Sequence, residues 1–346
     1  MDNRTRLVLL FGGKSAEHEV SCVSARHVAA ALDPAKFDVL AVGITRQGNW
    51  LLADLPDRLP DQLVAEGRRV SPAEMFAEPS SVIFPLIHGP LGEDGSLQGL
   101  LDIADRAYVG SGVLASAVCL DKAMSKLVCA HHNLPQCHYR TVSAHEDFEA
   151  AAETAITDLG LPLFIKPANM GSSVGVTRTS STSETIDALQ TAARYDQVLL
   201  IEEAVTGQEL EVAVLGNQEP QASPPGEIVP SDNFYSYSDK YLSDAAELKI
   251  PAQVPVDVAN EARRLALAAY GALRCEGMAR VDFFYEADGR GLLINEVNTI
   301  PGFTPISMFP KLWQSVGLEY PQLLETLVGL AQERLHRRHK HRHLGH

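Results

Sequence analysis

The sequence has little of what secreted, membrane-spanning or zinc-binding proteins need. Its five cysteines are sparse, odd in number and free of any Cys-x-x-Cys spacing, which argues against a disulfide framework or a zinc site. The apolar run near the start, Leu7 to Phe11, is short for a signal peptide, and no stretch approaches the length of a membrane span. We therefore expect a cytoplasmic protein with buried thiols and no membrane partner.

Basic residues are also scarce. The chain has 44 acidic against 29 Lys and Arg residues, a net charge of −15, and this balance argues against a nucleic-acid partner. Any anion must then be held by a few placed cations. Residues 334–346 differ, since they hold five of the cations, five of the 12 histidines and no acid. We expect this tail to be solvated and disordered, with metal chelation as the alternative.

The length of 346 residues indicates two or three domains. The first 120 residues read as an open α/β domain, which binds ligands in loops at the carboxyl ends of its strands. A buried strand ends at Gly12 and Gly13, and Ser15 is the expected cap of a helix over about 16–32. Strands are predicted at 37–45 and 81–89, around a loop-rich insert over 46–80.

The middle of the chain carries a glycine-rich loop between predicted strands. A helix is expected near Leu120, followed by strands at 161–167 and 197–205. The loop at 168–176, ANMGSSVGV, is similar to phosphate-cradling loops but lacks the Gly-Lys-Ser/Thr ending of a P-loop, so alone it is a weak signal. Lys166 closes the strand before it, and a phosphate would offset the cost of burying this lysine.

Near the end, residues 280–302 predict a hairpin around Asp288-Gly289-Arg290. If the turn is centred on Gly289, Asp282 lies opposite Glu296, and Arg280 lies opposite Asn298, all on one face. Two carboxylates and an amide oxygen suit Mg²⁺. The alternative is a solvated face with incidental charges, and a register error of one residue would undo the arrangement.

Seven motifs follow one another between about residues 7 and 325, and they read GGKSAEHEVS, HGPLGEDGSLQG, GSGVLASAVCLDK, KPANMGSSVGV, FYSYSDKYLSD, ARVDFF and INEVNTIPGFTPIS. In this order they resemble the motifs of the D-alanine:D-alanine ligase family of the ATP-grasp superfamily. Seven in order are specific, although any one alone would not be. The resemblance implies a three-domain ATP-grasp fold, α/β and α+β, with domains at 1–120, 121–211 and 212–333 and the tail at 334–346.

The same resemblance implies the reaction. ATP would activate one D-alanine as an acyl phosphate, and the amine of a second would attack it, giving D-alanyl-D-alanine for peptidoglycan precursors. ATP would be the co-substrate, two Mg²⁺ or Mn²⁺ the metals, and the protein a homodimer. The implied ATP-binding residues are Lys122, Lys166, Ser172, Ser173, Glu202, Glu203, Ala204, Val205, Glu209 and Lys240, and the implied metal ligands are Asp282, Glu296 and Asn298.

Amino-acid recognition is implied for a second group of residues. From the residues alone, Glu17 also fits the first turn of a helix, and His88 also fits a structural histidine. By resemblance, Glu17 would bind the ammonium of the first D-alanine, and His88 would lie near that amino acid. Ser307 would bind the carboxylate of the second D-alanine, and Arg280 and the N–H of Gly302 would form an oxyanion hole. When the loop at 231–244 closes, Tyr241 would form hydrogen bonds with Ser172 and Glu17.

Two rival interpretations remain. One is a relative that joins D-alanine to D-lactate or D-serine, and the loop at 231–244 discriminates, because its Lys240-Tyr241 pair resembles that of the dipeptide-forming enzymes. The other is a nucleotide-binding protein without ligase activity. The intact hairpin residues Arg280, Asp282 and Glu296 argue against that second interpretation.

Overall fold

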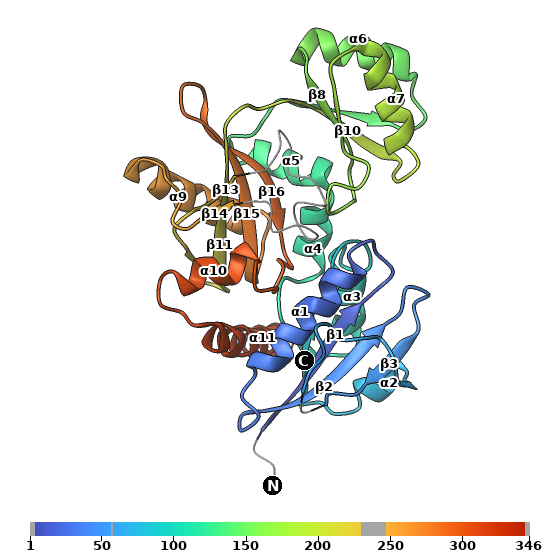
Figure 1. Ribbon diagram of the computed structural model, residues 1–346, viewed down its shortest axis with the longest axis vertical. Helices are drawn as coiled ribbons and strands as arrows, with labels where there is room; N and C mark the ends of the chain where they lie inside the picture. The colour runs from blue at the N-terminus through green and yellow to red at the C-terminus, as the bar shows by residue number, and fades with distance from the viewer. Residues whose placement is uncertain (1–3, 57, 230–246, 343–346) are drawn as a thin grey trace.

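The computed structural model describes residues 4–56, 58–229 and 247–342, and these form three β-sheets with flanking helices along one long axis (Figure 1). One sheet belongs to each of the three expected units, and the mixed α/β architecture of the prediction is present. Of the described helices, none is long and apolar enough to cross a membrane.

The first sheet is the open α/β domain expected from the sequence. Its order is β4-β3-β2-β1-β5-β6, with β1, β2, β5 and β6 parallel and β3 and β4 antiparallel at one edge. The central strand is buried on both faces, which explains its unbroken apolar run. Its elements are β1 (Thr5–Gly12), α1 (His18–Ala31), β2 (Phe37–Ile44), β3 (Trp50–Ala53), β4 (Arg68–Arg69), α2 (Pro72–Met75), β5 (Val82–Pro85), α3 (Ser96–Ile103), β6 (Ala107–Tyr108) and α4 (Val113–Leu120).

One local prediction in this domain was wrong. Ser15 does not cap α1, because the helix begins two residues later than expected and Glu17 occupies the cap position, while Ser15 Oγ accepts the N–H of Glu17 at 3.2 Å. The insert at 46–80 is loop-rich, as predicted, and also contains the short elements β3, β4 and α2. Elements as short as these leave little periodic pattern in a sequence.

The second sheet is antiparallel, in the order β7-β10-β8-β9. Helices α6 and α7 pack on one side of it through a small apolar core, and α5 contacts β10. Its elements are α5 (Lys122–His131), β7 (Tyr139–Ser143), α6 (Phe148–Leu159), β8 (Leu163–Pro167), β9 (Thr177–Thr179), α7 (Thr182–Ala192) and β10 (Val198–Glu203).

The third sheet runs β14-β13-β11-β15-β16, with β12 paired to β11. The expected boundary between residues 211 and 212 falls inside β11, which begins at Gln208. Its elements are β11 (Gln208–Gly216), β12 (Gln221–Ala222), β13 (Gly226–Val229), β14 (Glu247–Lys249), α9 (Val256–Ala272), β15 (Gly277–Glu286), β16 (Gly291–Asn298), α10 (Met308–Gln314) and α11 (Tyr320–Arg342).

The predicted hairpin register holds where the site residues lie. Arg280 pairs with Asn298, and Asp282 pairs with Glu296. Nearer the turn the register shifts, since Phe283 pairs with Ile294, which leaves Asn295 as the extra residue of a β-bulge. The turn is therefore centred half a residue before Gly289, and the bulge restores the expected pairing at the acids.

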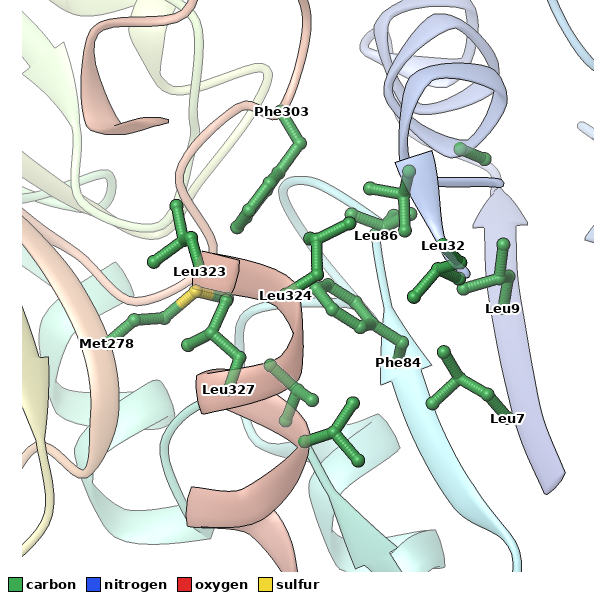
Figure 2. Packing of buried hydrophobic residues seen from close by; sticks show 14 of the residues in the cluster. Leu7, Leu9, Leu32, Phe84, Leu86, Met278, Phe303, Leu323, Leu324 and Leu327 are labelled. Carbon is green, nitrogen blue, oxygen red and sulfur yellow. The ribbon is translucent and has the colours of Figure 1, made fainter. Parts of the chain in front are cut away.

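The last helix joins the first and third sheets into one core. Figure 2 shows Leu324 of α11 beside Phe84 of β5, with Leu323 and Leu327 near Met278 of β15, and all five side chains are buried. Residues from opposite ends of the chain thus cover each other's apolar surface.

The prediction of a disordered basic tail was wrong for the part that the structure describes. Helix α11 continues to Arg342, and Arg334 is only 3% exposed, donating to the carbonyls of Gly110 and Tyr108. Arg338 forms an ion pair with Asp102 one turn later. Composition suggested solvation, but these carbonyl and carboxylate partners lie more than 200 positions away in sequence and order the helix.

Candidate active site

Two adjoining cavities lie between the three sheets. The larger, of about 700 Å³, is lined by residues of β8, β10, β11 and β13, by the segment 204–207 and by the glycine-rich loop, and the smaller, of about 320 Å³, reaches from the first domain to β16. Lys122, Ser172 and Glu296 line both cavities. A molecule in the larger cavity can therefore present one end to a molecule in the smaller.

A buried cluster of two lysines and one acid lies beside the larger cavity, and two of its members, Lys166 and Glu202, line that cavity. Lys166 Nζ lies 2.6 Å from Glu202 Oε2, and Lys126 Nζ lies 3.2 Å from Glu202 Oε1. Burial alone would raise the pKa of Glu202, but the two ammonium groups overcome it and lower this pKa to about 2. Glu202 is therefore ionised, and Lys166 stays charged beside it because the acid outweighs the burial that would lower its pKa.

The segment expected at the adenine, 202–205, lines this cavity together with Phe164 and Glu209. The Glu203 carboxylate turns to other partners, since it accepts the N–H of His138 at 2.6 Å and pairs with Arg290 at the hairpin turn. The Glu203 side chain is thus engaged with other parts of the protein.

The glycine-rich loop separates the cavities. Ser172 and Ser173 have φ values of 50° and 59°, a left-handed conformation that successive backbone N–H groups adopt around anions. Ser172 Oγ donates to Glu17, and a Cβ on Gly171 would lie 2.8 Å from a Glu17 oxygen, so glycine there lets the loop approach this carboxylate closely. Lys122 Nζ donates to the Met170 carbonyl at 2.7 Å, beside the same loop.

The polar face of the β15–β16 hairpin presents acids that are already close to cations. Arg280 donates two hydrogen bonds of 2.7 Å to Asp282 and lies 3.1 Å from Glu211, while Lys122 lies 3.5 Å from Glu296. Asn298 Nδ2 donates to Asp282 at 3.0 Å. Two facing carboxylates and an amide, in the expected register, are a donor set that fits Mg²⁺.

The first domain contributes Glu17 and His88 to the smaller cavity. His88 Nδ1 donates to the Ile300 carbonyl at 3.1 Å, and burial lowers the pKa of this imidazole although Glu17 lies near. Glu93 accepts the Gly89 N–H at 2.6 Å, and burial, reinforced by Glu17, raises its pKa to about 8. One acid of this cavity is thus held protonated at neutral pH.

Gly302 and Ser307 form the far wall of the smaller cavity. A Cβ on Gly302 would lie 2.6 Å from Ser307 Oγ, so a larger residue there would displace the Ser307 hydroxyl. Ser307 Oγ accepts the N–H of Thr304 at 2.9 Å. The wall therefore offers a hydroxyl and backbone groups within one short turn.

The structure brings most predicted site residues to these two cavities, while Lys240 and Tyr241 lie outside the described residues. Sequence reasoning missed three charged residues, namely Glu93, Lys126 and Glu211. Glu93 could have been found inside the motif HGPLGEDG, and Glu211 by its spacing of two from Glu209 on a strand. Lys126 has no such signal, because it reads as an ordinary helix lysine.

Comparison with known proteins gives the family. The models for the D-ala D-ala ligase N-terminus and C-terminus match residues 6–111 and 128–329. The chain is 44% identical over 352 residues to D-alanine–D-alanine ligase A of Chromobacterium violaceum, covering 96% of each, and 45% identical over 362 residues to D-alanine–D-alanine ligase of Shouchella clausii, covering 97% of each.

Solved structures agree with the sequence matches. The D-alanine-D-alanine ligase of Coxiella burnetii superposes with a TM-score of 0.85 at 34% identity, covering 98% of this chain and 97% of that one. The VanG D-Ala:D-Ser ligase of Enterococcus faecalis gives a TM-score of 0.81 at 32% identity, covering 95% and 99%. The expected ATP-grasp fold is confirmed, and the chain belongs to the D-alanine–D-alanine ligase family.

Proposed function

We propose that this protein uses ATP to join two D-alanines into D-alanyl-D-alanine, a peptidoglycan precursor, and releases ADP and phosphate. The observation that supports this most directly is the wall of Lys122, Ser172 and Glu296 that the two cavities share. It suits a nucleotide whose terminal phosphate meets a small zwitterion across that wall.

The nucleotide roles follow from position. Lys122 and Lys166 bind phosphate oxygens, the N–H groups around Ser172 and Ser173 cover them, and Glu209 meets the ribose. Asp282, Glu296 and Asn298 would hold two Mg²⁺ or Mn²⁺, which supply charge neutralisation and orientation for phosphoryl transfer. Because Arg280 and Lys122 already neutralise these acids, the protein keeps the site assembled before loading.

The residues that bind the two amino acids act in two successive steps of the reaction. Glu17 and His88 position the first D-alanine so that its carboxylate oxygen attacks the γ-phosphorus, the bond to the β-phosphate oxygen breaks, and ADP leaves. Ser307 then holds the carboxylate of the second D-alanine, whose neutral amine attacks the acyl carbon, and phosphate departs with the carbonyl bond restored. Arg280 and the N–H of Gly302 stabilise the oxyanion of that step.

The deciding experiment measures phosphate release from ATP with D-alanine, L-alanine, D-serine and D-lactate in parallel, with the product identified by mass. We expect release and a dipeptide with D-alanine alone. Release without D-alanine, or no release with it, would overturn the assignment.

A second candidate, D-alanyl-D-serine formation, is favoured by the likeness to a solved D-Ala:D-Ser ligase. The same assay separates it, because a mixed product would then dominate when both amino acids are present. We also propose a cytoplasmic homodimer, since ATP and D-alanine are available there and the family usually dimerises. Sedimentation of the purified protein tests the dimer.

A further inference from the structure

A buried lysine outside both cavities contacts the nucleotide machinery. Lys126 lies on α5 and is 3% exposed. Its ammonium lies 3.2 Å from Glu202, donates to Cys137 Sγ at 3.3 Å and sits 5.2 Å from the centre of the Tyr139 ring. Burying a lysine this completely costs free energy unless an acid accompanies it, so its partners indicate its role.

The charge count of this cluster is unequal. Glu202 is shared by Lys126 and Lys166, so the three buried groups carry one net positive charge, and only Lys166 of the three faces the cavity with appreciable exposure, 13% of its side chain. A simple Lys166–Glu202 pair would be neutral. The second lysine therefore leaves Lys166 with charge to offer a phosphate, in a protein whose net charge is −15.

We propose that Lys126 is a positioning residue that acts through Glu202 to keep Lys166 electrically available to nucleotide phosphates. It does so without touching the nucleotide, because Glu202 lies between it and Lys166. On phosphate binding Lys166 can loosen its bond to Glu202 at little cost, since Lys126 still neutralises that acid. The inference rests on the proposed function only in taking ATP as the occupant of the larger cavity.

The test compares a charged nucleotide, ATP, with the uncharged nucleoside adenosine by calorimetric binding to the full chain without D-alanine. Lys126→Met removes the charge and keeps the unbranched shape. We expect its affinity for ATP to fall about 10-fold or more, as the loss of one nearby charge in a partly buried site predicts, while the affinity for adenosine stays within about twofold. Cys137→Ala is the control, because it alters packing around the same ammonium without altering charge, and both affinities should stay near those of the parent.

Two further variants separate charge from packing. Lys126→Arg should restore most of the ATP affinity. Lys126→Met combined with Glu202→Gln returns the cluster to one net positive charge and leaves no buried ion without a partner except Lys166, so the ratio of ATP to adenosine affinity should recover even if the single variant folds poorly. An equal loss of ATP and adenosine affinity, or no recovery in the double variant, would overturn the proposal.

The outcome is independent of the ligase assignment. If the parent protein fails to join D-alanines but binds ATP, the proposed function is wrong while the affinity ratio still decides the role of Lys126. If the parent binds no ATP, both are wrong.

Discussion

The buried acids of the first domain and those of the second and third units have opposite surroundings. Glu17 accepts a bond from Ser172 and Glu93 accepts a backbone N–H, and the pKa of Glu93 rises to about 8 through burial. In the second unit, Glu202 lies between two lysines. Although burial would raise its pKa, the charges of these lysines lower it to about 2. Burial alone therefore does not decide ionisation, because the number of cations placed beside each acid does.

These two arrangements of acids suit two different functions. Asp282 and Glu296 are also held near Arg280 and Lys122, protein cations that the proposed metal ions would replace. The acids of the first domain instead accept hydrogen bonds, Glu17 from Ser172 and Glu93 from a backbone N–H. Four substitutions test this contrast, from the largest expected effect to the smallest.

The largest effect is expected for Arg280→Lys. Its guanidinium binds both oxygens of Asp282 and also approaches Glu211, a fork that an ammonium cannot reproduce. We expect turnover to fall about 100-fold or more, the size of one lost oxyanion-hole donor. Steady-state kinetics with a thermal unfolding control would check this, and a near-normal rate in a stable variant would make Arg280 structural.

Glu296→Gln should lower turnover by more than about tenfold, since each 1.4 kcal/mol of lost transition-state stabilisation costs that factor. Removing this charge weakens the metal site and also leaves Lys122 without the carboxylate 3.5 Å away. The measurement is the rate across a Mg²⁺ titration. Robust ligation at ordinary Mg²⁺ would show that the hairpin face has another role.

Ser172→Ala tests the acceptor role in the first domain. The substitution removes the hydrogen bond to Glu17 and leaves a buried carboxylate with one partner fewer, a loss of about 1 to 2 kcal/mol or about 5- to 30-fold in rate. The KM for D-alanine should rise more than that for ATP. A larger rise in the KM for ATP would place Ser172 chiefly at the phosphates.

Glu93→Gln should change stability with pH more than it changes turnover. The folded pKa of Glu93, about 8, lies above the ordinary value of 4.5, so the unfolded chain loses its proton first and the parent loses stability between about pH 4.5 and 8. Gln keeps an acceptor for the Gly89 N–H and does not titrate. The melting temperature of the variant should therefore rise relative to that of the parent as the pH increases across that window, and the two should be equal near pH 4. A difference in melting temperature that does not change with pH would contradict the raised pKa.

The sequence was most informative where function lies on regular strands. A turn signal and alternation were enough to place Asp282 opposite Glu296, although the pairing nearest the turn is shifted and the Asn295 bulge corrects it. Neither pattern predicts a bulge, so the correct pairing of Asp282 with Glu296 depended on a feature that the sequence does not signal. The fold and family followed from motif order.

Residues whose surroundings come from distant elements could not be predicted. Lys126 is buried because β10 brings Glu202 to it across 76 positions, and helix periodicity carries no trace of that. The prediction for the tail was wrong for the same reason, since Arg334 donates hydrogen bonds to carbonyls of the first domain. Composition describes what a segment prefers in water, not which partners the rest of the chain supplies.

The docking of α11 also sets an order of events during synthesis. Leu323, Leu324 and Leu327 complete the core that covers Leu7 and Phe84, so this face of the first domain is not fully covered until α11 has left the ribosome. A domain that is translated early thus closes late. We expect nascent chains that stop before Tyr320 to expose this apolar face and to be held by chaperones or degraded.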